Sequence, residues 1–140
     1  VQLHGSETPE RCLQLKQLHP TVRWWKALRL RTAEELRELS SFETHTDALL
    51  LDAWSPDQLG GTGHRLDPSW FTHLHNQLQP KTKWWLAGGI SAEWVPELLK
   101  LISPYGLDAS SRLEEKPGVK DLNKVHALVQ AVHDNRPLRQ

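Results

Sequence analysis

The chain has 140 residues, and its 17 lysines and arginines balance 17 aspartates and glutamates, so the formal net charge is zero. This balance argues against a nucleic-acid-binding protein or a polybasic membrane binder, and no stretch approaches the roughly 18 apolar residues of a membrane span. A hydrophobic content of 38% is enough for one soluble core but hardly for two domains. The single cysteine, Cys12, excludes an internal disulfide and fits a reducing, cytoplasmic compartment.

Five units of one kind follow along the chain, each with a short apolar run, a polar or glycine-rich turn, a helix cap and an amphipathic stretch. In the first unit the apolar run is 1–4, and Thr8 before Pro9 predicts the N-terminus of a helix. In the second unit residues 22–28 predict a strand, and 32–35 spell a capping box of the Thr-x-x-Glu type.

The third unit contains the most apolar strand, 48–52, a continuous run that ends in a carboxylate. Such runs are typical of parallel strands that are buried on both faces. A long loop, 53–66, precedes a helix predicted from Asp67-Pro68 to about Leu78. The last two units repeat the pattern, with predicted strands at 84–87 and 106–109 and helices that begin at Ser91 and Asp121.

Strands that alternate with helices form parallel sheets, which fits either a doubly wound open sheet or a (β/α)8 barrel. The first strand lacks the G-x-G-x-x-G turn of a dinucleotide-binding sheet, whereas polar turns follow several different strands, as in barrels. Five units are too few to close eight strands, and the chain has no methionine from which to start. The sequence therefore predicts an α/β fold, a partial (β/α)8 TIM barrel in which 1–140 is the C-terminal portion of a single domain.

Asp52 ends a run of leucines at the mouth of the predicted sheet. An apolar environment raises the pKa of a carboxyl group, which makes Asp52 a candidate proton donor near neutral pH. The alternative is an aspartate that only caps the following loop.

Two neighbouring strand ends carry the signal of a phosphate site. Gly88-Gly89 follow one strand, and Ser110-Ser111 follow the next. Glycines let a backbone approach an anion closely, and barrels commonly bind phosphate after their last two strands. Either pair alone is more simply explained as a tight turn, but together and in this order they favour phosphate.

His4 ends the first predicted strand, and it either contacts a substrate or is a neutral histidine hydrogen-bonded in the barrel mouth. The other histidines lie in predicted loops and helices and form no metal-binding pattern. Cys12 falls among leucines in the first helix, which favours a small helix residue over a nucleophile. The tryptophan pairs at 24–25 and 84–85 predict core filling.

Five motifs stand in a fixed order along the chain: Gln2-Leu3-His4-Gly5, Leu49-Leu50-Leu51-Asp52, Gly60-Gly61-Thr62-Gly63, Leu86-Ala87-Gly88-Gly89-Ile90 and Leu107-Asp108-Ala109-Ser110-Ser111. This order resembles the phosphoribosylanthranilate isomerase family of tryptophan biosynthesis. The resemblance implies a (β/α)8 barrel without cofactor or metal that acts on a phosphorylated small molecule. The implied reaction is the Amadori rearrangement of N-(5-phosphoribosyl)anthranilate to 1-(2-carboxyphenylamino)-1-deoxyribulose 5-phosphate.

By this resemblance Asp52 is the general acid that protonates the furanose ring oxygen and opens the ring. The implied substrate-binding residues are Gly88, Gly89, Ser110 and Ser111 around the phosphate, Asp108 close to the sugar, and His4, Gly60 and Gly61 at the substrate mouth.

The sequence departs from the family's pattern in ways that bear on activity. The family's general base is a cysteine in a Lys-Ile-Cys-Gly-like motif, which is absent here, and Cys12 lies on a predicted helix. The arginine that the family uses against the anthranilate carboxylate is also absent. Arg112 stands where many members have glycine, and it either alters the loop backbone or adds a cation near the phosphate.

The missing base predicts negligible turnover by the chain alone, since losing an acid–base partner typically costs about 10²–10⁴-fold. One alternative is a non-catalytic phosphate-binding half barrel that needs an N-terminal partner. Another is a different phosphate-binding barrel such as indole-glycerol-phosphate synthase, whose lysine acid and motif set are not found at these strand ends. Open sheet edges also predict self-association or poor stability in solution.

Overall fold

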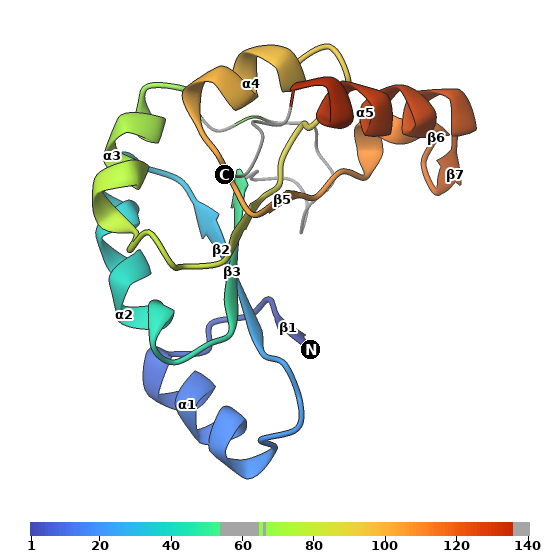
Figure 1. Cartoon of the computed structure of the whole chain (residues 1–140). Coiled ribbons are helices and arrows are strands. Elements are labelled where there is room, and N and C mark those ends of the chain that lie inside the picture. Colours follow the sequence, from blue (N-terminus) through green and yellow to red (C-terminus); the bar gives the residue numbers. More distant parts are fainter. Residues whose placement is uncertain (54–64, 66, 136–140) are drawn as a thin grey trace.

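In the computed structural model, which describes residues 1–53, 65 and 67–135, five strands form a parallel sheet (Figure 1). These strands are β1 (Gln2–Leu3), β2 (Trp25–Leu30), β3 (Ala48–Ala53), β4 (Trp84–Leu86) and β5 (Gly106–Leu107). Each strand pairs with the one before it in the chain, giving the order β1-β2-β3-β4-β5. In a doubly wound sheet the order in which strands are added reverses part-way along the chain. In a barrel each strand is added beside the one before it. The predicted barrel-type α/β fold is confirmed.

The helices follow one another in an arc outside the strands (Figure 1). They are α1 (Pro9–Leu18), the 3-10 helix η1 (Ala33–Glu38), α2 (Leu39–Glu43), α3 (Trp70–Gln77), α4 (Val95–Leu101), the 3-10 helix η2 (Ser111–Leu113) and α5 (Leu122–Asn135). A hairpin of β6 (Glu114–Lys116) and β7 (Val119–Lys120), which the sequence did not predict, precedes α5. Within the described residues, no helix combines the length and apolarity needed to cross a lipid bilayer.

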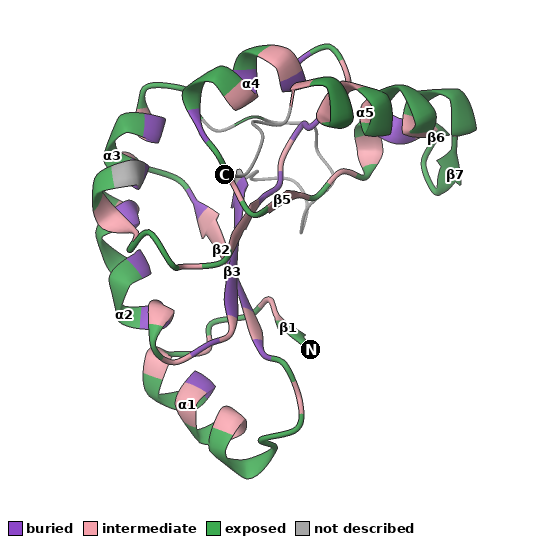
Figure 2. Cartoon of the chain, in the orientation of Figure 1, coloured by how far each residue is buried: buried purple, intermediate pink, exposed green. Residues whose placement is uncertain are grey.

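Alternate residues of the central strands pack on opposite faces of the sheet. Leu49 and Leu51 of β3 belong to the large core between sheet and helices. Leu50 points the other way, into a small cluster that we call the inner face, which comprises Ala27, Leu50, Trp85 and Ala87. Strand β3 is therefore buried on both faces, as its continuous leucine run predicts (Figure 2).

Aromatic rings cover the inner face towards the amino ends of the strands. The ring centroid of Trp85 lies 4.1 Å from that of Trp25 and 4.7 Å from that of Tyr105. Gly106 permits this stack, because a Cβ there would lie 2.2 Å from Nε1 of Trp85. Core filling by the tryptophans is confirmed.

The helix cap predicted at Thr8 is confirmed, and the helix predicted from Asp121 is capped by that side chain. Oγ1 of Thr8 accepts a hydrogen bond from the Arg11 N–H at 3.3 Å, and Pro9 is the first residue of α1. The Asp121 carboxylate accepts hydrogen bonds from the N–H groups of Asn123 and Lys124 at 2.8 and 3.3 Å at the start of α5. Both side chains satisfy amides that a helix leaves unpaired in its first turn.

Three local predictions are wrong. The Thr32 side chain makes no cap hydrogen bond, and the Glu35 carboxylate accepts from the Arg31 N–H, because these residues enter a 3-10 helix in place of an α-helix. Ser91 precedes a turn, so α4 begins only at Val95. Strand β2 ends at Leu30 rather than at residue 28, since its pairing with β3 continues to that point.

Candidate functional site

Asp52 lies at the carboxyl end of β3 and is 7% exposed. It stands in register with Arg29 of β2. Because it follows Leu50 by two residues, its side chain lies on the inner face and not behind a helix. The carboxyl group is therefore buried at the rim where the parallel strands end.

The Gly88-Gly89 turn lies directly beside Asp52. Ala87 N–H donates to the Leu51 carbonyl at 2.7 Å, which joins the end of β4 to the end of β3. The φ angles of Gly88 and Gly89 are 91° and 62°, a region where a residue with a Cβ is strained. Turns of this kind present backbone N–H groups that bind anions.

The serine pair follows β5 at the same rim. Asp108 N–H donates to the Leu86 carbonyl at 2.8 Å, so the end of β5 adjoins the end of β4. Lys120, to which the sequence assigned no role, donates from Nζ to the carbonyl and Oγ of Ser110, each at 3.0 Å. The same ammonium pairs with Glu114 at 2.6 Å, and its hydrogen bond lowers the pKa of that carboxyl group. A cation is thus fixed beside Ser110.

His4 lies just past the end of β1. One of its ring nitrogens has a hydrogen-bond partner, and the other has none among the described residues. Nδ1 lies 3.5 Å from Nε2 of Gln2. Nε2 of His4 is inaccessible to solvent and has no hydrogen-bond partner in the described part of the chain. The ring is therefore hydrogen-bonded through Nδ1, and both roles given to His4 above stay predictions.

A buried ion pair fixes the loop after His4. Nζ of Lys26, whose side chain is 3% exposed, donates to the Gly5 carbonyl at 2.7 Å and to Oε2 of Glu7 at 2.9 Å. The same carboxylate accepts from the Gly5 N–H at 3.0 Å. Burial alone would raise the pKa of Glu7, but these hydrogen bonds and the charge of Lys26 hold it below its usual value. The sequence pattern gave no sign of this pair, since Lys26 lies inside an apolar strand.

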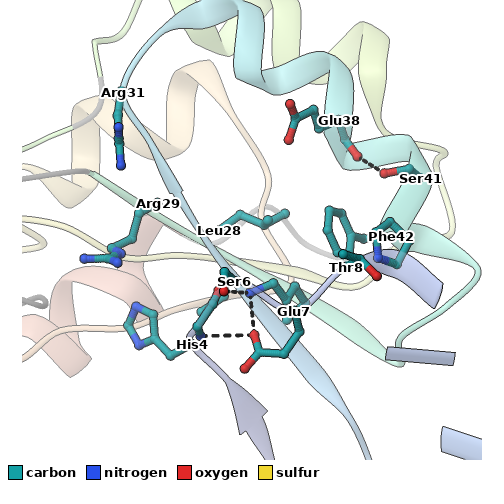
Figure 3. Close-up of a pocket in the computed structure, with 14 residues that line it drawn as sticks. His4, Ser6, Glu7, Thr8, Leu28, Arg29, Arg31, Glu38, Ser41 and Phe42 are labelled. Carbon is teal, nitrogen blue, oxygen red and sulfur yellow. Dashed lines mark hydrogen bonds and ion pairs between the residues drawn. The ribbon is translucent and has the colours of Figure 1, made fainter. Parts of the chain in front are cut away.

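A cavity of about 780 Å³ lies at the carboxyl ends of β1 and β2. Its lining includes His4, Glu7, Arg29 and Phe42 (Figure 3). Figure 3 shows Arg29 pointing to the same side of β2 as the His4 ring, away from Leu28. The sequence missed Arg29 because the predicted strand stopped one residue before it.

The family model and the curated relatives identify the family of this chain. The family model for N-(5'-phosphoribosyl)anthranilate isomerase matches residues 1–131. The chain belongs to this family. Among its relatives, the N-(5'-phosphoribosyl)anthranilate isomerase of Acaryochloris marina is 45% identical over 133 residues, which are 95% of this chain and 59% of that protein.

Solved structures of phosphoribosylanthranilate isomerases share the fold. The enzyme from Thermus thermophilus superposes with a TM-score of 0.75 and 33% identity over 96% of this chain and 60% of that one. A second isomerase, 22% identical, gives a TM-score of 0.73 over 96% of this chain and 59% of that one. The chain thus spans about three fifths of the length of the isomerases that it matches.

The other residues that the resemblance to phosphoribosylanthranilate isomerases singled out have different outcomes. Cys12 is fully buried in α1, and burial raises the pKa of its thiol, so it is no base or nucleophile, as predicted. Arg112 lies in η2, and no residue other than glycine has a positive φ in the described chain. Hydrogen bonds from Ser91 and from its own backbone lower the pKa of Glu93, and the charge of Arg112 lowers it further to a smaller extent. Gly60 and Gly61 lie outside the described residues.

No cluster of three or more histidine, cysteine, aspartate or glutamate side chains suited to a metal ion occurs within residues 1–53, 65 and 67–135. The groups that the structure gathers at the rim are instead a buried carboxyl, a two-glycine turn, a serine pair with its lysine, and an arginine with a histidine. Such a set is suited to proton transfer on an anionic substrate.

Proposed function

We propose that this chain takes part in the isomerisation of N-(5'-phosphoribosyl)anthranilate, with Asp52 as the general acid. The observation that carries this proposal is the position of the buried Asp52 carboxyl, one strand from Gly88-Gly89 and two strands from Ser110-Ser111 at one rim of the sheet. The second solved isomerase is in complex with reduced 1-(o-carboxyphenylamino)-1-deoxyribulose 5-phosphate, a product analogue, which supports the same class of ligand for this chain.

The first chemical step is ring opening. Asp52 gives its proton to the furanose oxygen as the C1–O bond breaks, and the lone pair of the anilino nitrogen forms a C=N bond at C1. The aspartate is left as a carboxylate, and the substrate becomes a protonated Schiff base. Backbone amides of the Gly88-Gly89 turn and the hydroxyls of Ser110 and Ser111 hold the phosphate, with the Lys120 ammonium adding positive charge. Asp108 faces the sugar hydroxyls.

The second step removes the proton from C2, and the resulting enolamine then tautomerises to the ketone. Cys12, the chain's single cysteine, is buried in α1 with its thiol pKa raised, so it does not supply this base. We therefore expect negligible turnover from the 140-residue chain alone, about 10²–10⁴-fold below a complete acid–base pair.

A chimera tests this assignment. The chain replaces the matching part of the Acaryochloris marina isomerase, whose remaining residues are kept, and loss of phosphoribosylanthranilate fluorescence is followed. We expect the chimera to be active and Asp52→Asn to lower kcat by about 10²–10⁴-fold, because asparagine cannot donate the proton.

The matched control is Asp67→Asn, since Asp67 is exposed and its carboxylate bonds only to Ser69 within the described chain. Equal activity of the Asp52→Asn and Asp67→Asn chimeras would overturn the role of Asp52. An inactive chimera that nevertheless folds would overturn the proposed function.

A further inference from the structure

The hairpin of β6 and β7 is a part of the fold whose residues bury little. Its strands are mostly exposed, and Val119, their one apolar side chain, is 41% exposed. The hairpin pairs Glu114 with Lys120 and so returns the chain to Ser110, ten residues earlier, before α5 begins (Figure 1). Because such a hairpin adds little by hydrophobic burial, its role lies in the polar contacts that it makes.

The most extensive of these contacts join Lys120 to Ser110. Nζ of Lys120 donates to the carbonyl oxygen and to Oγ of Ser110, each at 3.0 Å, and to Oε1 of Glu114 at 2.6 Å. An ammonium group has three hydrogens to donate, and these three acceptors use them all. A hydrogen bond to a ligand at this place therefore comes from Ser110 and not from Lys120.

The two bonds from Lys120 fix the side chain of Ser110. Because one ammonium contacts both the carbonyl oxygen and Oγ, the hydroxyl is held on the side of its own carbonyl and cannot turn freely about the Cα–Cβ bond. A hydroxyl has one hydrogen and two lone pairs, and Lys120 can only donate, so Oγ of Ser110 accepts in this bond. The hydrogen of the hydroxyl is thereby left for a different acceptor, such as a phosphate oxygen.

Glu114 holds the ammonium of Lys120 in place without the help of a ligand. Its side chain is 17% exposed, and its carboxylate also accepts from the Gly118 N–H at 3.2 Å across the hairpin turn. Lys124 of α5 donates to the carbonyl oxygen of Glu114 at 2.8 Å, which ties the hairpin to the helix. The protein thus fixes Lys120, and through it Ser110, before a ligand binds, and a preorganised site binds more tightly than one that the ligand must order.

We propose that Lys120 is a positioning residue, which orients the Ser110 hydroxyl so that it donates to the phosphate of the substrate. The hairpin β6–β7 supplies the backbone that carries Lys120 back to Ser110. This role rests on the proposed function, since the phosphate is that of N-(5'-phosphoribosyl)anthranilate. The alternative that the experiment excludes is an effect of the lysine charge alone.

Calorimetry on the full chain compares two ligands that differ only in the phosphate. They are reduced 1-(o-carboxyphenylamino)-1-deoxyribulose 5-phosphate and the same compound without its phosphate. We expect Lys120→Met to weaken binding of the phosphorylated ligand roughly tenfold and to leave binding of the other ligand unchanged. In a Ser110→Ala background the same change should cost less than about twofold, because the hydroxyl that Lys120 orients is gone.

Two further variants separate position from charge. Lys124→Met is the matched control, because it removes an ammonium that bonds to the same hairpin but not to Ser110, and it should leave both affinities unchanged. Glu114→Ala removes a negative charge near the cradle, so an effect of charge alone would strengthen binding of the phosphorylated ligand. We expect Glu114→Ala to weaken it instead, because Lys120 loses the carboxylate that holds it.

An equal cost of Lys120→Met with and without the Ser110 hydroxyl would overturn the positioning role and leave the proposed function standing. No cost, or equal weakening of both ligands, would overturn it as well. Urea unfolding checks that each variant folds, and if Lys120→Met does not, stronger binding by Glu114→Ala is the result that overturns the role. An unmodified chain that binds neither ligand, or binds both equally, would overturn the proposed function and the positioning role together.

Discussion

Charged side chains at the rim differ in whether the fold itself supplies their counter-charge. Lys26 and Glu7 pair with each other, and their shared contacts with Gly5 hold the backbone that follows His4. Arg29 has no such pair among the described residues. Matched charges at a rim serve to hold loops in position, whereas unmatched ones are available to a ligand.

Replacing Glu7 tests the holding role. Glu7→Gln removes the counter-charge of a buried ammonium, and we expect it to destabilise the chain at pH 7. The folded pKa of Glu7 is lowered, so its contribution is present above the unfolded value near 4.5 and is lost as the pH falls through the folded value. Urea denaturation of the unmodified chain and of Glu7→Gln should therefore show different free energies of unfolding at pH 7, and the difference should shrink as the pH falls.

Glu115→Gln is the control for this pH dependence, since Glu115 is an exposed residue of the β6–β7 hairpin. It should change stability little at either pH. A difference between Glu7→Gln and the unmodified chain that stays constant from pH 7 into acid would show that Glu7 acts through packing and not through its charge.

Sequence reasoning found the site residues that directly follow a strand. Asp52 and Gly88-Gly89 are visible because a change from apolar to polar or glycine marks the end of a strand. Arg29 and Lys26 are inside β2, where the face that each side chain occupies depends on pairing with β1 and β3. A shift of one residue in this register would move each side chain to the opposite face, and no local signal in the sequence fixes the register.

At the scale of elements, strands with a strong local pattern were predicted well, and those defined by their neighbours were not. The leucine run of β3 specifies a strand buried on both faces by itself. The strands of the hairpin β6–β7 are mostly charged and show no apolar alternation, so the sequence carries no signature of their pairing. The cap at Thr8, which uses one side chain, was predicted correctly. The capping box predicted at residues 32–35 does not form, because these residues lead into a 3-10 helix.

The packing of β5 against β4 requires a glycine at position 106, because a Cβ there would overlap Trp85. We expect Gly106→Ala to destabilise the chain by about 1–3 kcal/mol, because the added methyl group overlaps the Trp85 indole and that ring is held by Trp25 and Tyr105. Urea unfolding monitored by tryptophan fluorescence measures the loss.

Removing the indole gives the internal control for Gly106→Ala. In a Trp85→Leu background the same alanine should cost much less, so that the double-mutant cycle shows a coupling energy close to the original loss. An equal cost in both backgrounds would mean that Gly106 is required for its backbone and not for the space that it leaves to Trp85.

At the scale of the whole molecule, the sheet has two unpaired edges within the described chain. β1 pairs only with β2, and β5 pairs only with β4. Unpaired strand edges present N–H and C=O groups that pair readily with another chain, and closed barrels avoid this by joining their first and last strands.

We therefore predict that the isolated chain associates with itself through these edges. Sedimentation velocity should show a species whose size grows with concentration, and the melting temperature should rise with it. Gln2→Lys, at the exposed edge strand β1, should weaken this association, because lysine on an edge opposes pairing. Leu122→Glu is the control, since Leu122 is 79% exposed and belongs to helix α5 rather than to an edge strand. Association that Leu122→Glu abolishes and Gln2→Lys leaves intact would assign the contact to the apolar surface of α5 and contradict pairing at the edges.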